Sequence, residues 1–328
     1  MRRTRCKKMA TIRHPRRGSM AYAPRKRAKR IYPRVKTTPA KTGEPKPTGF
    51  AGYKVGMTQI TMIDDRKESP THNQEIVIPV TVLETPPLKV AAIRAYTDTP
   101  YGQKVLKEIW QDKPDKELDR KIDIQKKKHK QDALDKLENI SKYTLIVHTT
   151  PKIAGLSKKK PELFEIGING NLKDTLKYAK EILGKNITAK DVFKDGELTD
   201  TIAITKGYGF QGSVKRFGVK LLAKKSQKVI RKAGNLGPWH PHKTRRTVPQ
   251  MGQMGFHKRT QFNQRILKIS DDAKDINKDG WKNYGLIKTN YILIKGSIQG
   301  PAKRLIRLRP ASRPKNSPSE PEVTSIIL

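Results

Sequence analysis

Cysteine and long apolar runs are scarce in this sequence, and each scarcity excludes a class of protein. The chain has one cysteine, Cys6, so no disulfide can form within it, which fits a reducing compartment. No apolar run approaches the roughly 18 residues that a membrane span requires. The N-terminus is basic, but no apolar segment follows it as in a secretion signal. We therefore expect a cytoplasmic protein without a membrane partner.

The most informative absence is that of acidic residues. Residues 201–270 contain no Asp or Glu but sixteen Lys or Arg, and residues 1–48 contain seventeen Lys or Arg with Glu44 as their single acid. Catalytic sites that need convergent carboxylates are excluded from 201–270. The net charge of +41 would destabilise a compact monomer by self-repulsion, so a polyanion is expected to neutralise it. Nucleic acid is the first candidate.

Trp239 lies inside the acid-free segment, between Pro238 and Pro241. A segment that threads between phosphates loses affinity with each carboxylate, which explains the missing acids. An indole there can stack on a base or ribose, at about 1–3 kcal/mol per base. The alternative is an indole folded back onto the protein itself. Alone, the basic arm 1–48 should be disordered, and we expect both basic segments to become ordered on RNA.

Runs of alternating apolar residues predict short strands, and many short strands favour a small β-barrel. Helical spacing predicts helices over 119–140 and 171–183, the second with Asn171 as its N-cap and Gly184 as its stop. Residues 101–200 balance twenty-two cations with seventeen acids. We interpret this section as an α/β insertion in a mixed β-barrel. The predicted strands are 54–63, 75–84, 89–97, 144–149, 201–206, 265–270, 291–295 and 304–308.

Three patterns resemble catalytic or cofactor sites, and each has a simpler interpretation. Gly207–Gly212 matches G-x-G-x-x-G, but no acid follows about twenty residues later to bind a ribose, so we expect a glycine-rich turn. The histidines of the acid-free segment lack the Cys or carboxylate partners that would complete a metal site, so neither metal nor cofactor is expected. Four acids outside this segment are interpreted as exposed hairpin residues: Asp64, Asp65, Asp271 and Asp272.

A set of short motifs, in this order and spacing, resembles the universal large-subunit ribosomal protein L3 family. The basic arm, with His14–Ser19 and Ala23–Arg27, and the insertion resemble the archaeal and eukaryotic branch of that family. The motifs run along most of the chain: Gly52–Thr58 (GYKVGMT), Gly207–Gly212 (GYGFQG) with Val214–Arg216, Gly237–Pro241 (GPWHP), Gln250–Arg259 (QMGQMGFHKR) and Ile294–Pro301 (IKGSIQGP).

The resemblance implies a six-stranded barrel like that of translation factors, an extended N-terminal arm and a long central finger loop. It further implies a structural, non-catalytic protein that binds large-subunit rRNA and neighbouring ribosomal proteins, supports subunit assembly and forms no homo-oligomer. Trp239 would be the finger tip, near the peptidyl transferase centre. The implied boundaries are 1–48 for the arm, 49–100 and 198–309 for the barrel, 101–197 for the insertion, 207–262 for the finger loop and 310–328 for the tail.

Residues expected to contact rRNA are the basic and histidine side chains of both extensions, with the tryptophan. Two other functions stay open: an RNA-processing or RNA-modifying enzyme on a barrel, which needs a carboxylate near the basic surface, and a general nucleic-acid compaction protein. The expected contact residues are Arg13, Arg16, Arg17, Arg25, Lys26, Arg27, Lys215, Arg216, Arg231, Lys232, Trp239, His240, His242, Lys243, Arg245, Arg246, His257, Lys258, Arg259 and Arg265.

Overall fold

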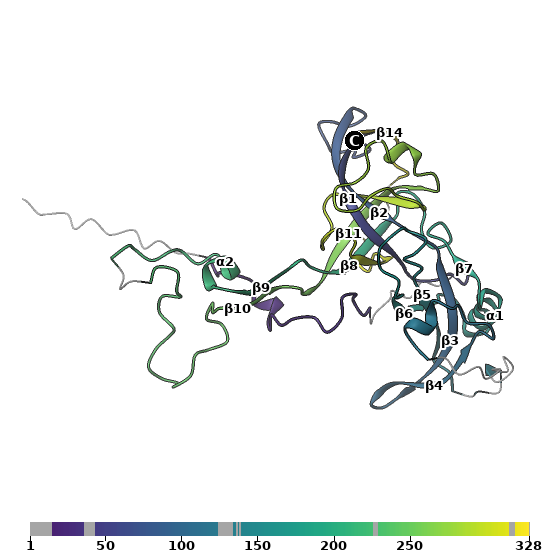
Figure 1. Cartoon of the computed structure of the whole chain (residues 1–328), viewed down its shortest axis with the longest axis horizontal. Helices are drawn as coiled ribbons and strands as arrows, with labels where there is room; N and C mark the ends of the chain where they lie inside the picture. Colours follow the sequence, from purple (N-terminus) through teal and green to yellow (C-terminus); the bar gives the residue numbers. More distant parts are fainter. Residues whose placement is uncertain are drawn as a thin grey trace, which may run out of the picture. The chain divides into compact units, whose positions relative to one another are not determined.

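The computed structural model describes residues 15–35, 43–123, 134–135, 137, 139–225, 229–314 and 319–327. The chain divides into two compact units. The first, which we call the loop unit, comprises Met1–Ala28 and Gly207–His257. The second, the sheet unit, comprises Lys29–Lys206 and Lys258–Leu328. Strands greatly outnumber helices (Figure 1), so the expectation of a β-rich protein is confirmed.

Seven antiparallel strands form the larger sheet of the sheet unit. β13 also pairs with β1, so the pairings from β1 through β2, β12, β11, β8 and β13 return to β1. A sheet closed in this way exposes no edge along the circuit. The strands, in spatial order, are β13 (Leu305–Pro310), β8 (Leu198–Ile204), β11 (Lys258–Ser270), β12 (Tyr291–Lys295), β2 (Glu75–Glu84), β1 (Phe50–Ile63) and β14 (Val323–Ile327).

Side chains from β1, β2, β11 and β12 form one apolar cluster, in which Val55, Ile60, Val80, Val82 and Leu293 are fully buried. Val80 and Val82 are two residues apart because alternate side chains of a strand point to the same face. Burying each such side chain contributes roughly 1.5–3 kcal/mol. A register slip of one residue would turn the whole set outward, so the cluster fixes the register.

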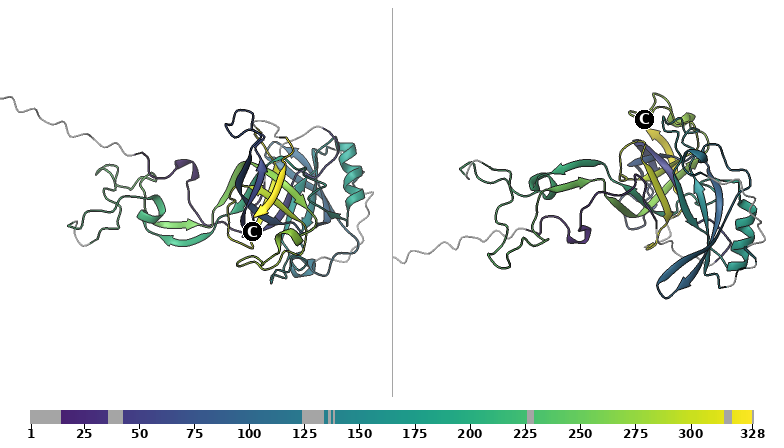
Figure 2. Two further views of the ribbon diagram at one scale, coloured as in Figure 1. Left: turned by 90° about the horizontal axis from the view of Figure 1, so that it is seen from above. Right: turned by 60° about the horizontal axis from the view of Figure 1, so that its bottom comes forward.

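A second, five-stranded sheet follows in the order β4–β3–β5–β6, with β7 paired to β3. β3 belongs to this sheet, whereas the sequence grouped residues up to 100 with the barrel. β3 is buried on both faces, and a strand of that kind has the same residue pattern in the centre of either sheet. α1 contacts β5 and β3 (Figures 1 and 2). The elements are β3 (Leu88–Thr99), β4 (Gly102–Trp110), β5 (Lys142–His148), β6 (Leu163–Gly167), α1 (Leu172–Ile182) and β7 (Asn186–Ile187).

The helix predicted over 171–183 is confirmed as α1, with Asn171 as N-cap and Gly184, at φ 81°, just beyond the C-cap. Most of the helix predicted over 119–140 lies outside the described residues, since 124–133, 136 and 138 are not among them. The described residues at its start form a 3₁₀ turn, η2 (Leu118–Arg120), in place of an α-helix. A further 3₁₀ turn, η4 (Lys274–Ile276), follows β11.

In the loop unit, β9 (Gly207–Gln211) pairs antiparallel with β10 (Gly252–Gly255). The glycine-rich motif therefore forms a strand of a two-stranded ribbon. α2 (Ser213–Phe217) follows it and ends at Gly218, whose φ of 64° closes the turn. From the N-terminal arm comes the 3₁₀ turn η1 (Met20–Tyr22), capped by the Ser19 hydroxyl. No helix in the described part of the chain is long and apolar enough to cross a membrane.

Candidate nucleic-acid interface

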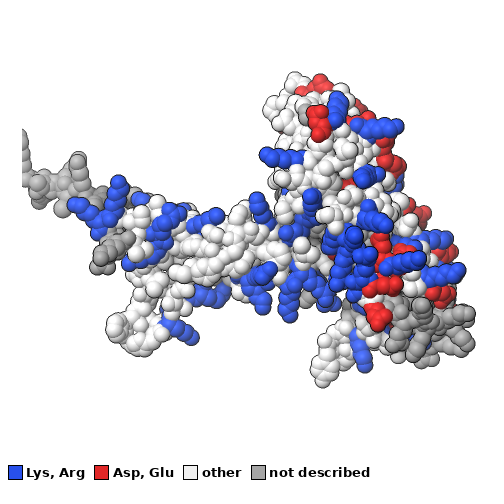
Figure 3. Space-filling view, viewed as in Figure 1, with Lys and Arg blue, Asp and Glu red and all other residues white. Residues whose placement is uncertain are grey.

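All charged side chains of the loop unit are positive. Its two segments contain 22 Lys and Arg, while all 30 Asp and Glu of the chain lie in the sheet unit. In Figure 3, Lys and Arg appear on the loop unit without acidic residues, whereas the sheet unit displays both signs. Surface charges of ordinary soluble proteins mix signs, so a unit with no counter-charge of its own is suited to a polyanionic partner.

Arg216 of α2 holds the ribbon and the N-terminal arm together. Its guanidinium donates to the carbonyl oxygens of Gln253 (3.0 Å, from Nε), Gln250 (3.0 Å), Met251 (3.4 Å) and Arg25 (3.3 Å). Only the fork-like geometry of arginine supplies donors in so many directions. Burial lowers the pKa of Arg216, and the neighbouring charge of Arg25 lowers it further. Arg216 thus has a structural role in the loop unit.

The arm makes further contacts with the same ribbon. The Ala28 amide donates to the Phe256 carbonyl (2.9 Å), and His257 Nδ1 lies 3.0 Å from the Lys26 carbonyl. Arg25 covers the Phe217 ring at 4.3 Å from its centre, within the range of a cation–π contact. Residues 15–28 therefore have a docking site on the unit's own residues, which the sequence prediction of an independently disordered arm did not foresee.

Most of the predicted contact residues of the loop unit are open to solvent. Three arginines, Arg17, Arg25 and Arg216, are half-buried, and His257 is buried. Arg13 lies outside the described residues. The exposed members are Arg16, Lys26, Arg27, Lys215, Arg231, Lys232, Trp239, His240, His242, Lys243, Arg245 and Arg246.

The indole of Trp239 is 81% exposed, so it is not folded onto the protein's own core. The turn before it is held by the Asn235 side chain, whose Oδ1 accepts from the Gly237 amide (2.8 Å). Gly237 has φ 126°, a conformation that favours glycine. The Trp239 ring meets His242 edge-on at 6.1 Å, and His242 meets His240 at 4.5 Å. The tip thus presents a group of rings to solvent.

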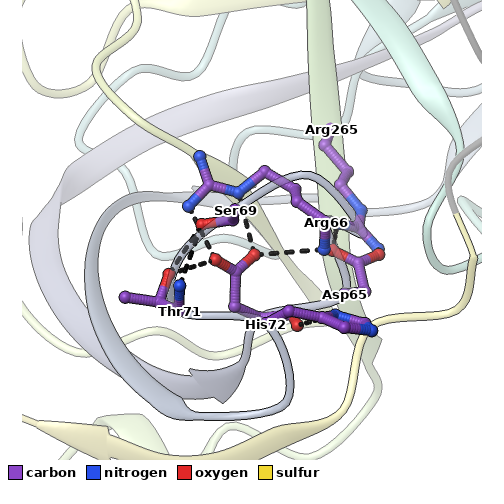
Figure 4. Close-up of polar contacts among 7 residues, drawn as sticks. Asp65, Arg66, Ser69, Thr71, His72 and Arg265 are labelled. Carbon is purple, nitrogen blue, oxygen red and sulfur yellow. Dashed lines mark hydrogen bonds and ion pairs between the residues drawn. The ribbon is translucent and has the colours of Figure 1, made fainter.

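Three predicted residues lie on β11 in the sheet unit. Lys258 is exposed and Arg259 is half-buried. Arg265 is buried and lies against Asp65 (Figure 4), with which it forms a bidentate pair through contacts of 2.9 and 2.6 Å. It also donates to the Ser319 carbonyl. This guanidinium is held inside the protein by a carboxylate that the sequence pattern did not pair with it, so Arg265 lacks the exposure that the predicted rRNA contact requires.

Asp64 and Asp65 are also corrected, because neither is a simple exposed hairpin acid. Asp64 is buried and accepts two hydrogen bonds from Arg66 (both 2.8 Å) and one from Thr71 (2.6 Å) (Figure 4). The hydrogen bonds from Arg66, which have the largest effect, and from Thr71 hold the pKa of Asp64 far below its usual range. Asp271 and Asp272 are exposed as predicted.

These carboxylates do not form a catalytic group. Asp64 and Asp65 accept hydrogen bonds from separate arginines, and Asp271 accepts from Asn290 (2.7 Å) and pairs with Lys190. Within the described ranges, no three His, Cys, Asp or Glu side chains come together as metal ligands would.

Two exposed aromatic rings on β9 were not among the predicted contact residues. Tyr208 is 46% exposed and Phe210 is 71% exposed, both in the acid-free unit. Lys215 Nζ lies 5.1 Å from the centre of the Tyr208 ring. The signal was present in the sequence, since GYGFQ places two aromatics among glycines. The stretch was interpreted as a glycine-rich turn and as a family motif, and its two rings were assigned no role.

The acid-free loop unit, with its exposed cations and rings, has the features of a surface that binds a polyanion. Comparison with known proteins gives the family. The family model described as ribosomal protein L3 matches residues 9–326. The chain belongs to the ribosomal protein L3 family.

Archaeal relatives cover nearly the whole chain. The chain is 49% identical over 306 residues to the large ribosomal subunit protein uL3 of Archaeoglobus fulgidus, covering 92% of each chain. It is 48% identical over 322 residues to the uL3 of Methanococcus vannielii, covering 95% of this chain and 96% of the relative. The uL3 of Methanococcoides burtonii is 46% identical over 330 residues, covering 97% and 98%. The archaeal-type resemblance read from the motifs is confirmed.

Proposed function

We propose that this protein is a non-catalytic component of the large subunit of the cytoplasmic ribosome, where it binds large-subunit rRNA and neighbouring ribosomal proteins and supports subunit assembly. The observation that carries the proposal is the loop unit, with 22 cations, no acid and an exposed tryptophan. Family membership supports the ribosomal location, and the relatives are named as large-subunit proteins.

The circuit of strands from β1 to β13 supports a six-stranded barrel like that of translation factors, with the five-stranded sheet as its insertion. We propose residues 1–48 as an arm, 207–262 as the finger loop and 310–328 as a tail. The finger loop carries Trp239 at its tip toward the peptidyl transferase centre. There the indole supports the rRNA by stacking, while the RNA performs the chemistry.

Electrostatics gives this interface its strength. Each phosphate that a Lys or Arg neutralises releases condensed counterions and contributes about 0.7–0.9 to the slope of log affinity against log salt. The exposed cations of the loop unit are the proposed phosphate contacts. Contacts that involve the buried or internally bonded residues Arg216, His257 and Arg265 are left out of the proposed interface.

Binding of the full-length chain to transcribed archaeal large-subunit rRNA, to unrelated RNA of equal length and to duplex DNA tests the proposal. We expect a steep salt dependence for all three and a clear preference for the rRNA at physiological salt, because folded rRNA offers fixed positions for phosphates and stacked bases. Equal affinity for all three would instead identify a general compaction protein. Turnover of the RNA that is lost on Asp271→Asn would identify an enzyme.

A further inference from the structure

Two aromatic rings of β9 are exposed on the loop unit. Phe210 is 71% exposed and Tyr208 is 46% exposed, whereas the rings that hold this unit together, Phe217 and Phe256, lie under the guanidinium groups of Arg25 and Arg27. Exposed aromatic surface costs free energy in water unless a partner covers it. The rings of β9 are therefore available for a ligand.

The polar side chains beside the two rings form hydrogen bonds within the ribbon, so the rings are the part of this surface that a ligand can contact. The Gln253 side chain, opposite Phe210 in the ribbon, donates to the carbonyls of its own strand at Met254 (3.2 Å) and Gly255 (3.0 Å). The Gln211 side chain donates to the Tyr208 carbonyl (2.7 Å). Between the rings, Gly209 has no side chain, and a Cβ built there meets no heavy atom within 4 Å.

The charge of the surroundings selects the class of ligand. Lys215 Nζ lies 5.1 Å from the Tyr208 ring centre, and the whole unit contains no carboxylate. A cation beside an aromatic face matches a nucleotide, whose base stacks on the ring while its phosphate meets the ammonium group. A protein partner would need an unusually acidic surface, whereas single-stranded RNA supplies both features in every nucleotide.

We propose that Tyr208 and Phe210 form a base-stacking platform for unpaired nucleotides of the RNA, with Lys215 binding the adjoining phosphate. This inference rests on the proposed function and adds to it a second stacking site, separate in sequence from the Trp239 tip. Stacking depends on the π-face and not on base identity, so the platform recognises single-stranded RNA without reading its sequence. Its contribution is local to nucleotides that the rRNA fold leaves unstacked.

The test measures dissociation constants of the full-length chain for transcribed archaeal large-subunit rRNA at several salt concentrations. Phe210→Leu and Tyr208→Leu should each weaken binding about 5- to 150-fold, because one stacked base is lost. Neither should change the log–log salt slope, since no charge is removed. Lys215→Gln should lower that slope by about 0.7–0.9. Phe210→Trp, which keeps a π-face, should bind like the wild type.

Tyr101→Leu is the matched control, because Tyr101 is a fully exposed aromatic of the sheet unit and should leave the affinity unchanged. Chemical probing of the bound rRNA should reveal unpaired bases that the wild type protects and Phe210→Leu exposes. An unchanged affinity and footprint in Phe210→Leu and Tyr208→Leu would overturn the platform while leaving the proposed function intact. A wild-type chain without preference for rRNA would remove the proposed function itself.

Discussion

Replacing Arg216 by alanine should loosen the loop unit without unfolding the sheet unit. The substitution removes four donated bonds, of which those to Gln253 and Gln250 are the shortest at 3.0 Å. Arg216 is half-buried, so water replaces part of what is lost, and we assign about 0.5–1.5 kcal/mol to each of these two bonds. The total of about 1–3 kcal/mol corresponds to a roughly 5- to 150-fold increase in local opening.

Amide hydrogen exchange in the free full-length protein measures that opening. The reporters are the Ala28 amide, which bonds to the Phe256 carbonyl at 2.9 Å, and the Gly218 amide, which bonds to the Val214 carbonyl at 2.8 Å. Both should exchange about 5- to 150-fold faster in Arg216→Ala. Amides of β2 serve as the internal reference and should not change.

Arg216→Lys is the matched variant, because lysine keeps the charge but lacks the planar fork that reaches both the ribbon and the arm. It should show an intermediate acceleration. If Arg216→Ala left the exchange of both reporters as in the wild type, the arm and ribbon would not depend on this guanidinium, and the assignment of Arg216 as a structural residue would be refuted.

Three further predictions address the packing of the loop unit, the ion pair of Asp65 with Arg265, and Trp239. Gly252→Ala places a Cβ 3.0 Å from Arg216 Nη1 at a glycine with φ 156°, so it should accelerate the exchange of the same two amides. Gly212→Ala is the control, because a Cβ there meets no atom within 4 Å and should leave the exchange unchanged. Equal effects of the two substitutions would contradict the packing argument. Arg265 depresses the pKa of Asp65, so this carboxylate stabilises the fold above its unfolded pKa of about 3.9 and the benefit is lost as the pH falls through the lower folded pKa. The melting temperature of the wild type should therefore fall more steeply below about pH 4 than that of Asp65→Asn, and parallel curves would count against the pair. Trp239→Ala should leave incorporation into subunits largely intact and weaken the binding of substrate at the peptidyl transferase centre. Failed incorporation with normal activity in the particles that form would refute the tip assignment.

Local patterns made much of the fold predictable. Alternating apolar residues located β2 and β12 at their observed bounds, and helical spacing with Asn171 and Gly184 located α1. Each of these elements is specified by neighbours within a few residues. The predicted barrel range 49–100 includes β3, which pairs in the five-stranded sheet. A strand buried on both faces does not indicate by its own residues which neighbours it pairs with.

The candidate site was predictable in charge but not in detail. Absence of acids identified the loop unit, and Trp239 proved exposed as the stacking hypothesis requires. Sequence reasoning could not separate Arg265 from the cations that face solvent, since its partner Asp65 is 200 residues away. Nor could it find the docking of the arm through Arg25 and Arg216, whose contact spans 191 positions.

By itself, the sequence determined the sign of the charge along the chain, the places of eight strands and the family, because each depends on residue type and short spacing; β4, β6, β7, β9, β10 and β14 were not predicted. Only the tertiary structure decided which strands close on one another, which arginine is internal and which rings remain exposed. Those outcomes depend on burial and pairing between segments far apart in the chain, and a local pattern of residues carries no information about them.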